Sequence, residues 1–330
     1  MRAVIVREFG PVESHVVGEL PDPRPKPDEV LVTIEATAVN FVDLLVVTGK
    51  YQFLPERPFS PGKLPAGVVS AVGVDVTDLK VGDRVLTLAE HGGYAQMVCV
   101  PASQCFKLPA ATSFVDAAAM ALVYDTSWFA LRERGRLHAG ESVLVLGATG
   151  GIGLASIQLA KAFGARVLAG VSTADKSDLV RDAGADAIID LSQADLRNSL
   201  REQVYSKNGA NGVDIVVDPI GGDAFDAALR AVAWRGRVIV VGFASGRIPT
   251  IKANYLLLKN IEVSGLQISD YRKRTPDLMA QCMKEIFALF ESGKLRPSPA
   301  VTYPLERFAN AMQDVQDRKI RGRAVLVQNP

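Results

Sequence analysis

The sequence has few of the side chains that build metal sites and disulfide frameworks. Its 330 residues include three histidines and three cysteines. These are His15, His91, His138, Cys99, Cys105 and Cys282. The histidines are scattered without the short spacing of a zinc site, and three cysteines do not suggest a disulfide framework. We therefore expect reduced, mostly buried cysteines and no metal site built on histidine.

The sequence also lacks an excess of charge and a long apolar run. It holds 37 basic and 36 acidic residues, and this balance gives no global electrostatic attraction for nucleic acid or anionic membranes. No uninterrupted apolar stretch approaches the roughly 18 residues of a transmembrane helix, and charge soon follows the short apolar run at the N-terminus. We expect a cytoplasmic protein that binds a small molecule, with no nucleic acid and no membrane as partner.

The pattern of apolar residues divides the chain in two. Up to about residue 123 it is β-rich, with strands expected at 29–38, 68–74 and 95–100. From residue 124, strands and helices alternate. The expected strands are 142–146, 166–170, 187–190, 212–218 and 237–242, with helices at 153–163 and 176–183. Continuous apolar strands separated by helices predict a parallel sheet covered on both faces, which is a doubly wound α/β domain.

The C-terminal segment is too short to form a domain alone. A helix is expected at 278–292 and a strand at 324–327, but about 60 residues cannot easily bury an independent core. We expect this tail to complete the first domain. The predicted domains are therefore 1–123 together with 268–330, and 124–267 inserted between these two pieces.

A glycine-rich turn follows the strand expected at 142–146. The pattern Ala148-x-Gly150-x-x-Gly153 fits the dinucleotide fingerprint G-x-G-x-x-G, with alanine in the first position. Gly150 would let the backbone approach a pyrophosphate, and Gly153 would let the helix pack closely on the strand. The amides of Gly151 and Ile152 would face the phosphates. An ordinary glycine-rich turn is the alternative, but the strand before it and the apolar helix after it favour nucleotide binding.

The residues after the second strand of this domain favour NADPH. NAD-binding domains carry an acidic residue about 20 positions beyond the fingerprint to hold the ribose 2′-hydroxyl, whereas Gly170 stands at this place. Without a carboxylate nothing repels a 2′-phosphate, and Ser172 and Lys176 can donate hydrogen bonds to it. Alternatively, Ser172 caps the following helix and Lys176 is a solvated residue of its first turn.

Several motifs together resemble the quinone oxidoreductase branch of the medium-chain dehydrogenase/reductase superfamily, and they run nearly from end to end of the chain. They include Val39-Asn40-Phe41-Val42-Asp43, Gly49-Lys50-Tyr51, Val81-Gly82-Asp83-Arg84-Val85, Gly92-Gly93-Tyr94-Ala95, Gly212-Val213-Asp214 and Asp218-Pro219-Ile220-Gly221-Gly222. The resemblance implies a discontinuous, β-rich GroES-like catalytic domain and a Rossmann domain. It also implies NADPH-linked reduction of quinones or of the C=C bond of enones and enals.

The resemblance bears on zinc as well. Where the zinc-dependent alcohol dehydrogenases of the superfamily carry catalytic ligands, this chain has Asn40 and Lys63-Leu64. Asparagine is a poor zinc ligand and lysine brings a competing charge. We therefore expect a zinc-free enzyme, whose acceptor must already be electrophilic because no Lewis acid activates it. Leu64 also replaces a glutamate that is usual in the family, so we expect a rebuilt loop.

The resemblance implies roles for individual residues. Tyr51, and with it Asn40, would donate to the acceptor oxygen that gains negative charge. Tyr51 could instead be a packing aromatic, and Asn40 a turn-stabilising amide. Asp43 is a third catalytic candidate, although a structural hydrogen-bonding role near the nicotinamide is favoured. The further cofactor contacts implied are Asn40, Thr126 (followed by Ser127 where the family has alanine), Gly242, Phe243, Ser245 and Arg323.

Two other functions stay open at this point. A 2-enoyl thioester reductase would need a basic groove for an acyl carrier, which the run Arg272-Lys273-Arg274 could supply, although such a run is more often a solvated loop. A non-catalytic NADPH-binding protein, crystallin-like or RNA-binding, is the second. The near-neutral net charge argues against dedicated RNA binding.

The segment 261–266 bears on the oligomeric state. It is an apolar strand that would lie near the exposed edge of the nucleotide-binding sheet. Because an open edge invites pairing with a copy of itself, we expect a homodimer in which two sheets join across a twofold axis.

Overall fold

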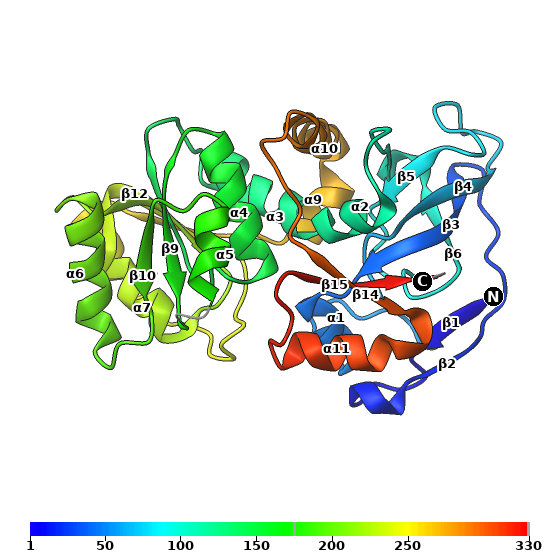
Figure 1. Ribbon diagram of the computed structural model, residues 1–330, viewed down its shortest axis with the longest axis horizontal. Coiled ribbons are helices and arrows are strands. Elements are labelled where there is room, and N and C mark those ends of the chain that lie inside the picture. Colours follow the sequence, from blue (N-terminus) through cyan, green and yellow to red (C-terminus); the bar gives the residue numbers. More distant parts are fainter. Residues whose placement is uncertain (174–175, 329–330) are drawn as a thin grey trace. The chain divides into compact units, whose positions relative to one another are not determined.

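The computed structural model describes residues 1–173 and 176–328 (Figure 1). Its contacts divide the chain into two compact units. The first comprises Met1–Leu122, Arg272–Met283 and Pro297–Pro330, and the second comprises Val123–Tyr271 and Lys284–Arg296. The main part of the second unit has ends close to the expected 124–267. Residues Lys284–Arg296 differ from the expectation, because they group with the second unit and not with the tail.

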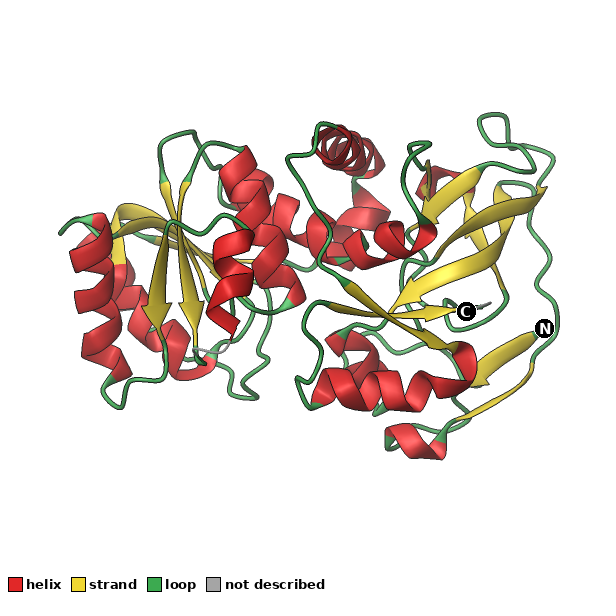
Figure 2. Cartoon of the chain, in the orientation of Figure 1, coloured by secondary structure: helices red, strands yellow, loops and turns green. Residues whose placement is uncertain are grey.

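The first unit is built on a mostly antiparallel sheet with the strand order β14-β15-β3-β4-β5-β7, and β6 also pairs with β3 (Figure 2). Its strands are β3 (Glu29–Ala38), β4 (Ala66–Val72), β5 (Arg84–Thr87), β6 (Met97–Pro101), β7 (Cys105–Lys107), β14 (Ala300–Pro304) and β15 (Arg323–Val327). A small separate sheet pairs β1 (Arg2–Ile5) with β2 (Val16–Glu19). Because β15 pairs with β3, the end of the chain completes the sheet of the first unit.

Alternation along β3 determines which of its residues enter the core. Buried and half-buried positions alternate over most of the strand, as the period of two in a strand requires. Val30, Val32 and Ile34 pack in one apolar cluster with residues of β4, β5 and β6. A second cluster holds buried residues of α1 (Phe41–Val47) and α11 (Phe308–Gln316), which contact one another. This second cluster supports the N-terminus of α1, where candidate site residues lie.

The second unit contains a parallel sheet with the order β10-β9-β8-β11-β12-β13. Its strands are β8 (Ser142–Val145), β9 (Arg166–Val171), β10 (Ala187–Asp190), β11 (Val213–Asp218), β12 (Val232–Val240) and β13 (Glu262–Gly265). Numbered within the unit, this order is 3-2-1-4-5-6, that of doubly wound dinucleotide-binding sheets. The predicted parallel α/β fold is confirmed, although β12 begins and ends earlier than the expected strand 237–242.

Helices cover this sheet on both faces, as Figure 1 shows with α4 and α5 on one side and α6 and α7 on the other. The helices that follow its strands are α4 (Gly151–Ala162), α5 (Ser177–Asp182), α6 (Leu196–Asn208), α7 (Gly222–Ala231) and α8 (Ala253–Lys259). α9 (Ile268–Arg274) and α10 (Pro276–Glu291) come later in the chain. Apolar residues of the strands, such as Leu144, and of α7, such as Phe225, form the core beneath these helices.

One helical stretch in the described part of the chain, Phe114–Arg134, is long and apolar enough by composition to cross a membrane. It comprises α2 (Phe114–Met120), α3 (Val123–Trp128) and a π-helical turn at Phe129–Arg134. Of its most apolar window, 78% is buried inside the protein. Burial of this extent is typical of the core helix of a globular fold.

Candidate active site

The glycine-rich turn between β8 and α4 has the geometry that the fingerprint predicts. Gly147 adopts a left-handed backbone with φ of +59°, which favours glycine. A Cβ on Gly153 would lie 2.4 Å from the carbonyl oxygen of Gly147, so only glycine lets α4 pack this closely on the turn. The N-terminus of α4 therefore follows the strand directly, as a pyrophosphate site requires.

Gly150 differs from these two glycines, because nothing in the described structure requires glycine there. It is the N-cap of α4 and has an ordinary φ of −82°. A Cβ on it would lie 3.4 Å from the Gly147 oxygen, which is normal van der Waals contact. A phosphate approaching the amides of Gly151 and Ile152 would need this open surface. The residues of the turn thus fit a dinucleotide pyrophosphate.

α3 packs on the first turn of α4 through serine hydroxyls. The Ser127 hydroxyl donates to the carbonyl oxygen of Ile152 over 3.2 Å, and the Ser156 hydroxyl donates to Ser127 Oγ over 3.0 Å. Serine at position 127 therefore stabilises the phosphate-binding turn, a contribution that the sequence did not indicate. Thr126 is buried beside it, and its backbone amide donates to Asp125 Oδ1. Its role toward the nicotinamide stays a prediction.

Ser172 and Lys176 lie at the carboxyl end of β9, next to β8 in the sheet. Ser172 is exposed directly after the strand, and Lys176 is half-buried at the N-cap of α5. Gly170 lies within β9, so no carboxylate projects from this position. Residues 174–175, between the two candidates, lie outside the described residues. The placement of Ser172 and Lys176 on the edge that carries the glycine turn is compatible with binding a ribose 2′-phosphate.

The loops after β11 and β12 are tied together at the same edge of the sheet. The buried carboxylate of Asp218 accepts hydrogen bonds from the backbone amides of the turn that follows it, including that of Ile220 at 3.0 Å. The Gly242 amide donates to the Asp218 carbonyl oxygen, and the Ser245 amide donates to that of Ile220. Phe243, held between these contacts, keeps 41% of its surface exposed. The sequence predicted site residues in the loop after β12. It did not indicate that Asp218 holds the loops after β11 and β12.

In the first unit, the N-terminus of α1 gathers a connected set of buried polar side chains. Asn40 is the N-cap, and its backbone amide donates to Asp43 Oδ2 over 2.8 Å. The Tyr94 hydroxyl donates to the same oxygen over 3.1 Å. Arg323, from β15, donates from Nη2 to Asn40 Oδ1 over 2.6 Å. Three predicted site residues therefore share one network, and Tyr94 joins them.

The contacts of Asp43 favour the structural role over acid–base chemistry. Asp43 occupies the N3 position of α1, where it completes a capping box with Asn40. Burial raises the pKa of Asp43 to about 6, although the Asn40 amide and the charge of Lys63 oppose the shift. Burial, and then the neighbouring Asp43, raise the pKa of Tyr94 well above its usual value. Tyr94 therefore stays protonated and donates, while Asp43 accepts.

Tyr51 is half-buried beside a charge cluster that the sequence did not reveal. The Lys63 ammonium lies 5.6 Å from the centroid of the Tyr51 ring. It donates to Glu90 Oε2 over 2.5 Å and to the Glu90 carbonyl oxygen over 3.0 Å. Arg272 donates to the other carboxylate oxygen of Glu90 over 2.8 Å. With 1% of its side chain exposed, Arg272 is not part of a solvated loop, and that interpretation was wrong for this residue.

The positions that hold catalytic zinc in related dehydrogenases do not fit a metal here. The side-chain oxygen of Asn40 accepts from Arg323, and Lys63 carries a positive charge paired with Glu90. Leu64 is buried with a left-handed φ of +53°, and its amide donates to Ala89. Among the described residues, no group of three or more His, Cys, Asp or Glu could hold a metal ion.

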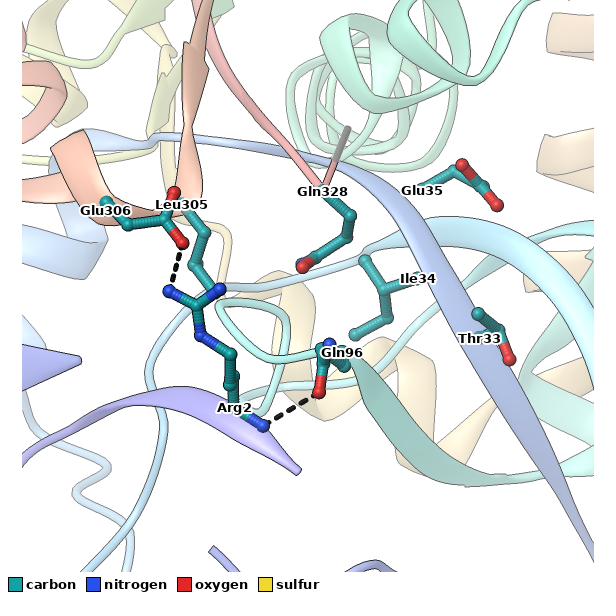
Figure 3. Close-up of a pocket in the computed structure, with 8 residues that line it drawn as sticks. All are labelled: Arg2, Thr33, Ile34, Glu35, Gln96, Leu305, Glu306 and Gln328. Carbon is teal, nitrogen blue, oxygen red and sulfur yellow. Dashed lines mark hydrogen bonds and ion pairs between the residues drawn. The ribbon is translucent and has the colours of Figure 1, made fainter. Parts of the chain in front are cut away.

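A polar cavity of about 220 Å³ lies in the first unit (Figure 3). It is lined by Arg2, Thr33, Ile34, Glu35, Gln96, Leu305, Glu306 and Gln328. The Arg2 amide donates to Gln96 over 2.8 Å, and its guanidinium pairs with Glu306. The lining contains no predicted site residue, so we do not assign the reaction to this cavity.

The doubly wound sheet, its glycine turn and the separate β-rich unit define a two-unit dinucleotide-dependent oxidoreductase. Two family models match the chain, the alcohol dehydrogenase GroES-like domain over residues 26–110 and the zinc-binding dehydrogenase over residues 151–285. The quinone oxidoreductase-like protein 2 homolog of Nematostella vectensis is 38% identical over 301 residues, which cover 90% of this chain and 81% of the relative. This chain belongs to the quinone oxidoreductase branch of the medium-chain dehydrogenase/reductase superfamily.

A similar solved structure and a further similar sequence support this assignment. The crystal structure of Escherichia coli quinone oxidoreductase complexed with NADPH has a TM-score of 0.91 and 29% identity, and covers 99% of this chain and 100% of that one. The human synaptic vesicle membrane protein VAT-1 homolog is 31% identical over 348 residues, covering 100% of this chain and 87% of the relative. The predicted family and fold are confirmed. The expected cytoplasmic location stays a prediction.

Proposed function

We propose that this chain transfers hydride from NADPH to quinones or to the C=C bond of enones and enals, without zinc. For a quinone, NADPH, the quinone and one proton yield NADP⁺ and the hydroquinone. The observation that carries the proposal is the pair of side chains at the zinc-ligand positions. The protonated Lys63 is paired with Glu90 and has no lone pair for a metal, and the Asn40 oxygen, a poor zinc ligand, already accepts a hydrogen bond from Arg323. An acceptor that is electrophilic by itself suits such a site.

NADPH is the proposed hydride donor. The Gly147–Gly153 turn would bind the pyrophosphate through the amides at the start of α4. Ser172 and Lys176 would bind the 2′-phosphate at the end of β9, where no carboxylate repels it. The nicotinamide supplies the hydride when bound, and the protein contributes binding, orientation and the exclusion of water.

Tyr51 is the proposed hydrogen-bond donor to the acceptor oxygen that gains negative charge. Its side chain is partly exposed, whereas those of Asn40 and Asp43 are buried and occupied by partners. A donor directed at the developing charge lowers the barrier by electrostatic stabilisation. We assign Asn40, Asp43 and Arg323 to holding α1 and the loop that follows it.

The basic run in α9 does not favour an acyl-carrier groove. The guanidinium of Arg272 is buried on Glu90, and the ammonium of Lys273 lies over the ring of Phe53 at 5.9 Å. The charges of Arg272 and Lys273 are therefore engaged within the first unit. This makes the thioester reductase the weaker alternative.

A homodimer is proposed through the second unit. β13 ends the order of its sheet, and an edge strand offers unpaired backbone groups. α8, which precedes β13, has no buried residue, and its Leu257 and Leu258 are 77% and 75% exposed. A second copy of the chain would cover this apolar surface and extend the sheet.

An acceptor panel tests the proposed function. NADPH oxidation is followed with quinones, enones, enoyl thioesters and no acceptor. Quinones or enones should accelerate it well above the acceptor-free rate. Acceleration by thioesters alone would favour the thioester reductase, and no acceleration by any acceptor would favour a non-catalytic binding protein.

A further inference from the structure

Lys63 is a charged side chain for which the proposed reaction has no role so far. Only 5% of its side chain is exposed. A buried ammonium is costly unless it is paired, and Lys63 donates two hydrogen bonds to one residue, Glu90. The carboxylate and the carbonyl oxygen of Glu90 fix the position of the ammonium from two directions.

Glu90 serves two cations at once. The Lys63 ammonium lies 2.5 Å from one carboxylate oxygen, and the Arg272 guanidinium lies 2.8 Å from the other. Burial alone would raise the pKa of Glu90, but Arg272 and Lys63 outweigh it and hold the pKa at about 2. Glu90 is therefore ionised at neutral pH. Its carboxylate holds both cations through charge and hydrogen bonds.

One of these two cations, that of Lys63, lies against the aromatic loop that carries Tyr51. The Lys63 ammonium is within cation–π distance of the Tyr51 ring, at 5.6 Å. Tyr51 and Phe53 meet edge to face with centroids 6.3 Å apart, and Lys273 lies over Phe53 at 5.9 Å. Each of the two aromatic rings in this loop thus contacts one cation. Glu90 binds the ammonium of Lys63 and fixes its position.

We propose that Lys63 is a positioning residue for Tyr51, and that it acts through the aromatic ring. This inference rests on the proposed function. The ammonium holds the ring in one orientation, and its charge draws electron density from the phenol, which makes the hydroxyl a stronger hydrogen-bond donor. The hydroxyl then stabilises the acceptor oxygen as hydride arrives from NADPH, and solvent supplies the proton that completes the product.

A double-mutant cycle tests the proposal, with kcat and KM for a quinone measured in the intact enzyme. The variants are Lys63→Met, Tyr51→Phe and the two combined. Lys63→Met should lower kcat about fivefold to tenfold while the KM for NADPH stays unchanged. Because Lys63 acts through the Tyr51 hydroxyl, adding Lys63→Met to Tyr51→Phe should cause little further loss. Lys63→Arg, which keeps a cation, should restore most of the rate.

Arg272→Met is the matched control. Lys63→Met leaves the Glu90–Arg272 pair, and Arg272→Met leaves the Glu90–Lys63 pair, so each variant retains one neutral ion pair. Only the first removes the cation against Tyr51, and Arg272→Met should keep kcat within about twofold. Thermal unfolding verifies that each variant is folded. If Lys63→Met is unstable, Lys63→Gln replaces it in the cycle, because its amide can still donate to Glu90.

Three results would overturn the proposal. Lys63→Met could leave kcat unchanged, or it could lower kcat by the same factor with and without the Tyr51 hydroxyl. Arg272→Met could also lower kcat as much as Lys63→Met, which would indicate a general loss of structure. An unmodified enzyme that reduces no quinone or enone would overturn the proposed function, and this inference with it.

Discussion

The Tyr94 hydroxyl donates to Oδ2 of Asp43 over 3.1 Å, which joins two buried side chains 51 positions apart in the sequence. The same oxygen accepts the backbone amide of Asn40. One acceptor atom thus satisfies two donors and connects α1 to the segment before β6. A neutral amide oxygen could accept both hydrogen bonds, so they do not require the buried negative charge of the carboxylate.

Asp43→Asn should therefore stabilise the protein at neutral pH. Because burial raises the folded pKa to about 6, the folded state binds a proton more tightly than the unfolded state. The contribution of Asp43 to the stability of the parent protein accordingly falls as pH rises from about 4 to about 6 and then levels off. Relative to the parent, Asp43→Asn should gain up to about 3 kcal/mol across this window and little at pH 4.

Urea unfolding at pH 4, 5, 6 and 7 measures this difference. Asp43→Ala is the control, since it removes the acceptor oxygen and should destabilise the protein at each pH. A difference between Asp43→Asn and the parent that does not change with pH would contradict a raised pKa.

The two glycines of the phosphate-binding turn should respond differently to alanine. Gly153→Ala places a Cβ 2.4 Å from a backbone oxygen, so it should lower the melting temperature. Gly150→Ala meets only ordinary contacts at 3.4 Å, so the fold should tolerate it while NADPH affinity falls about tenfold or more. Differential scanning fluorimetry and NADPH titration separate the effects. Unchanged NADPH affinity in Gly150→Ala would argue against the pyrophosphate site.

Cofactor preference should depend on Lys176. NADPH should bind at least about tenfold more tightly than NADH, roughly 1.4 kcal/mol, because no carboxylate stands at Gly170. Lys176→Ala should remove most of this preference, and Ser172→Ala a smaller part, with NADH affinity unchanged in both. Isothermal titration of both nucleotides gives the ratio. Equal affinities in the parent protein would show that the end of β9 does not bind a 2′-phosphate.

Light scattering tests whether the exposed surface of the second unit forms a dimer interface. Light scattering should give the mass of a dimer, because β13 has an open edge and Leu257 and Leu258 are exposed. Leu257→Lys with Leu258→Lys should shift the protein toward the monomer by adding like charges to the twofold interface. A monomer mass for the parent at every concentration would refute the dimer.

The fold and the glycine-rich turn could be predicted because both depend on local sequence. Apolar strands such as 142–146, the glycine pattern after them and the missing acid at Gly170 are readable within short segments. The cluster around Tyr51 could not be predicted in this way. Glu90 lies 27 positions from Lys63 and 182 from Arg272, so only the tertiary fold brings the charges together. Within the sequence, Lys63 in the largely apolar segment 61–69 is a signal of a buried charge, but it does not identify the partner.

Activity in the absence of zinc distinguishes a zinc-free NADPH-dependent reductase from a zinc-dependent alcohol dehydrogenase. Protein treated with a chelator and shown by elemental analysis to hold well under one zinc per chain is assayed in both directions. We expect full NADPH oxidation with quinones or enones and almost no NADP⁺ reduction with simple alcohols. Stoichiometric zinc that is required for activity, or alcohol oxidation faster than quinone and enone reduction, would contradict it.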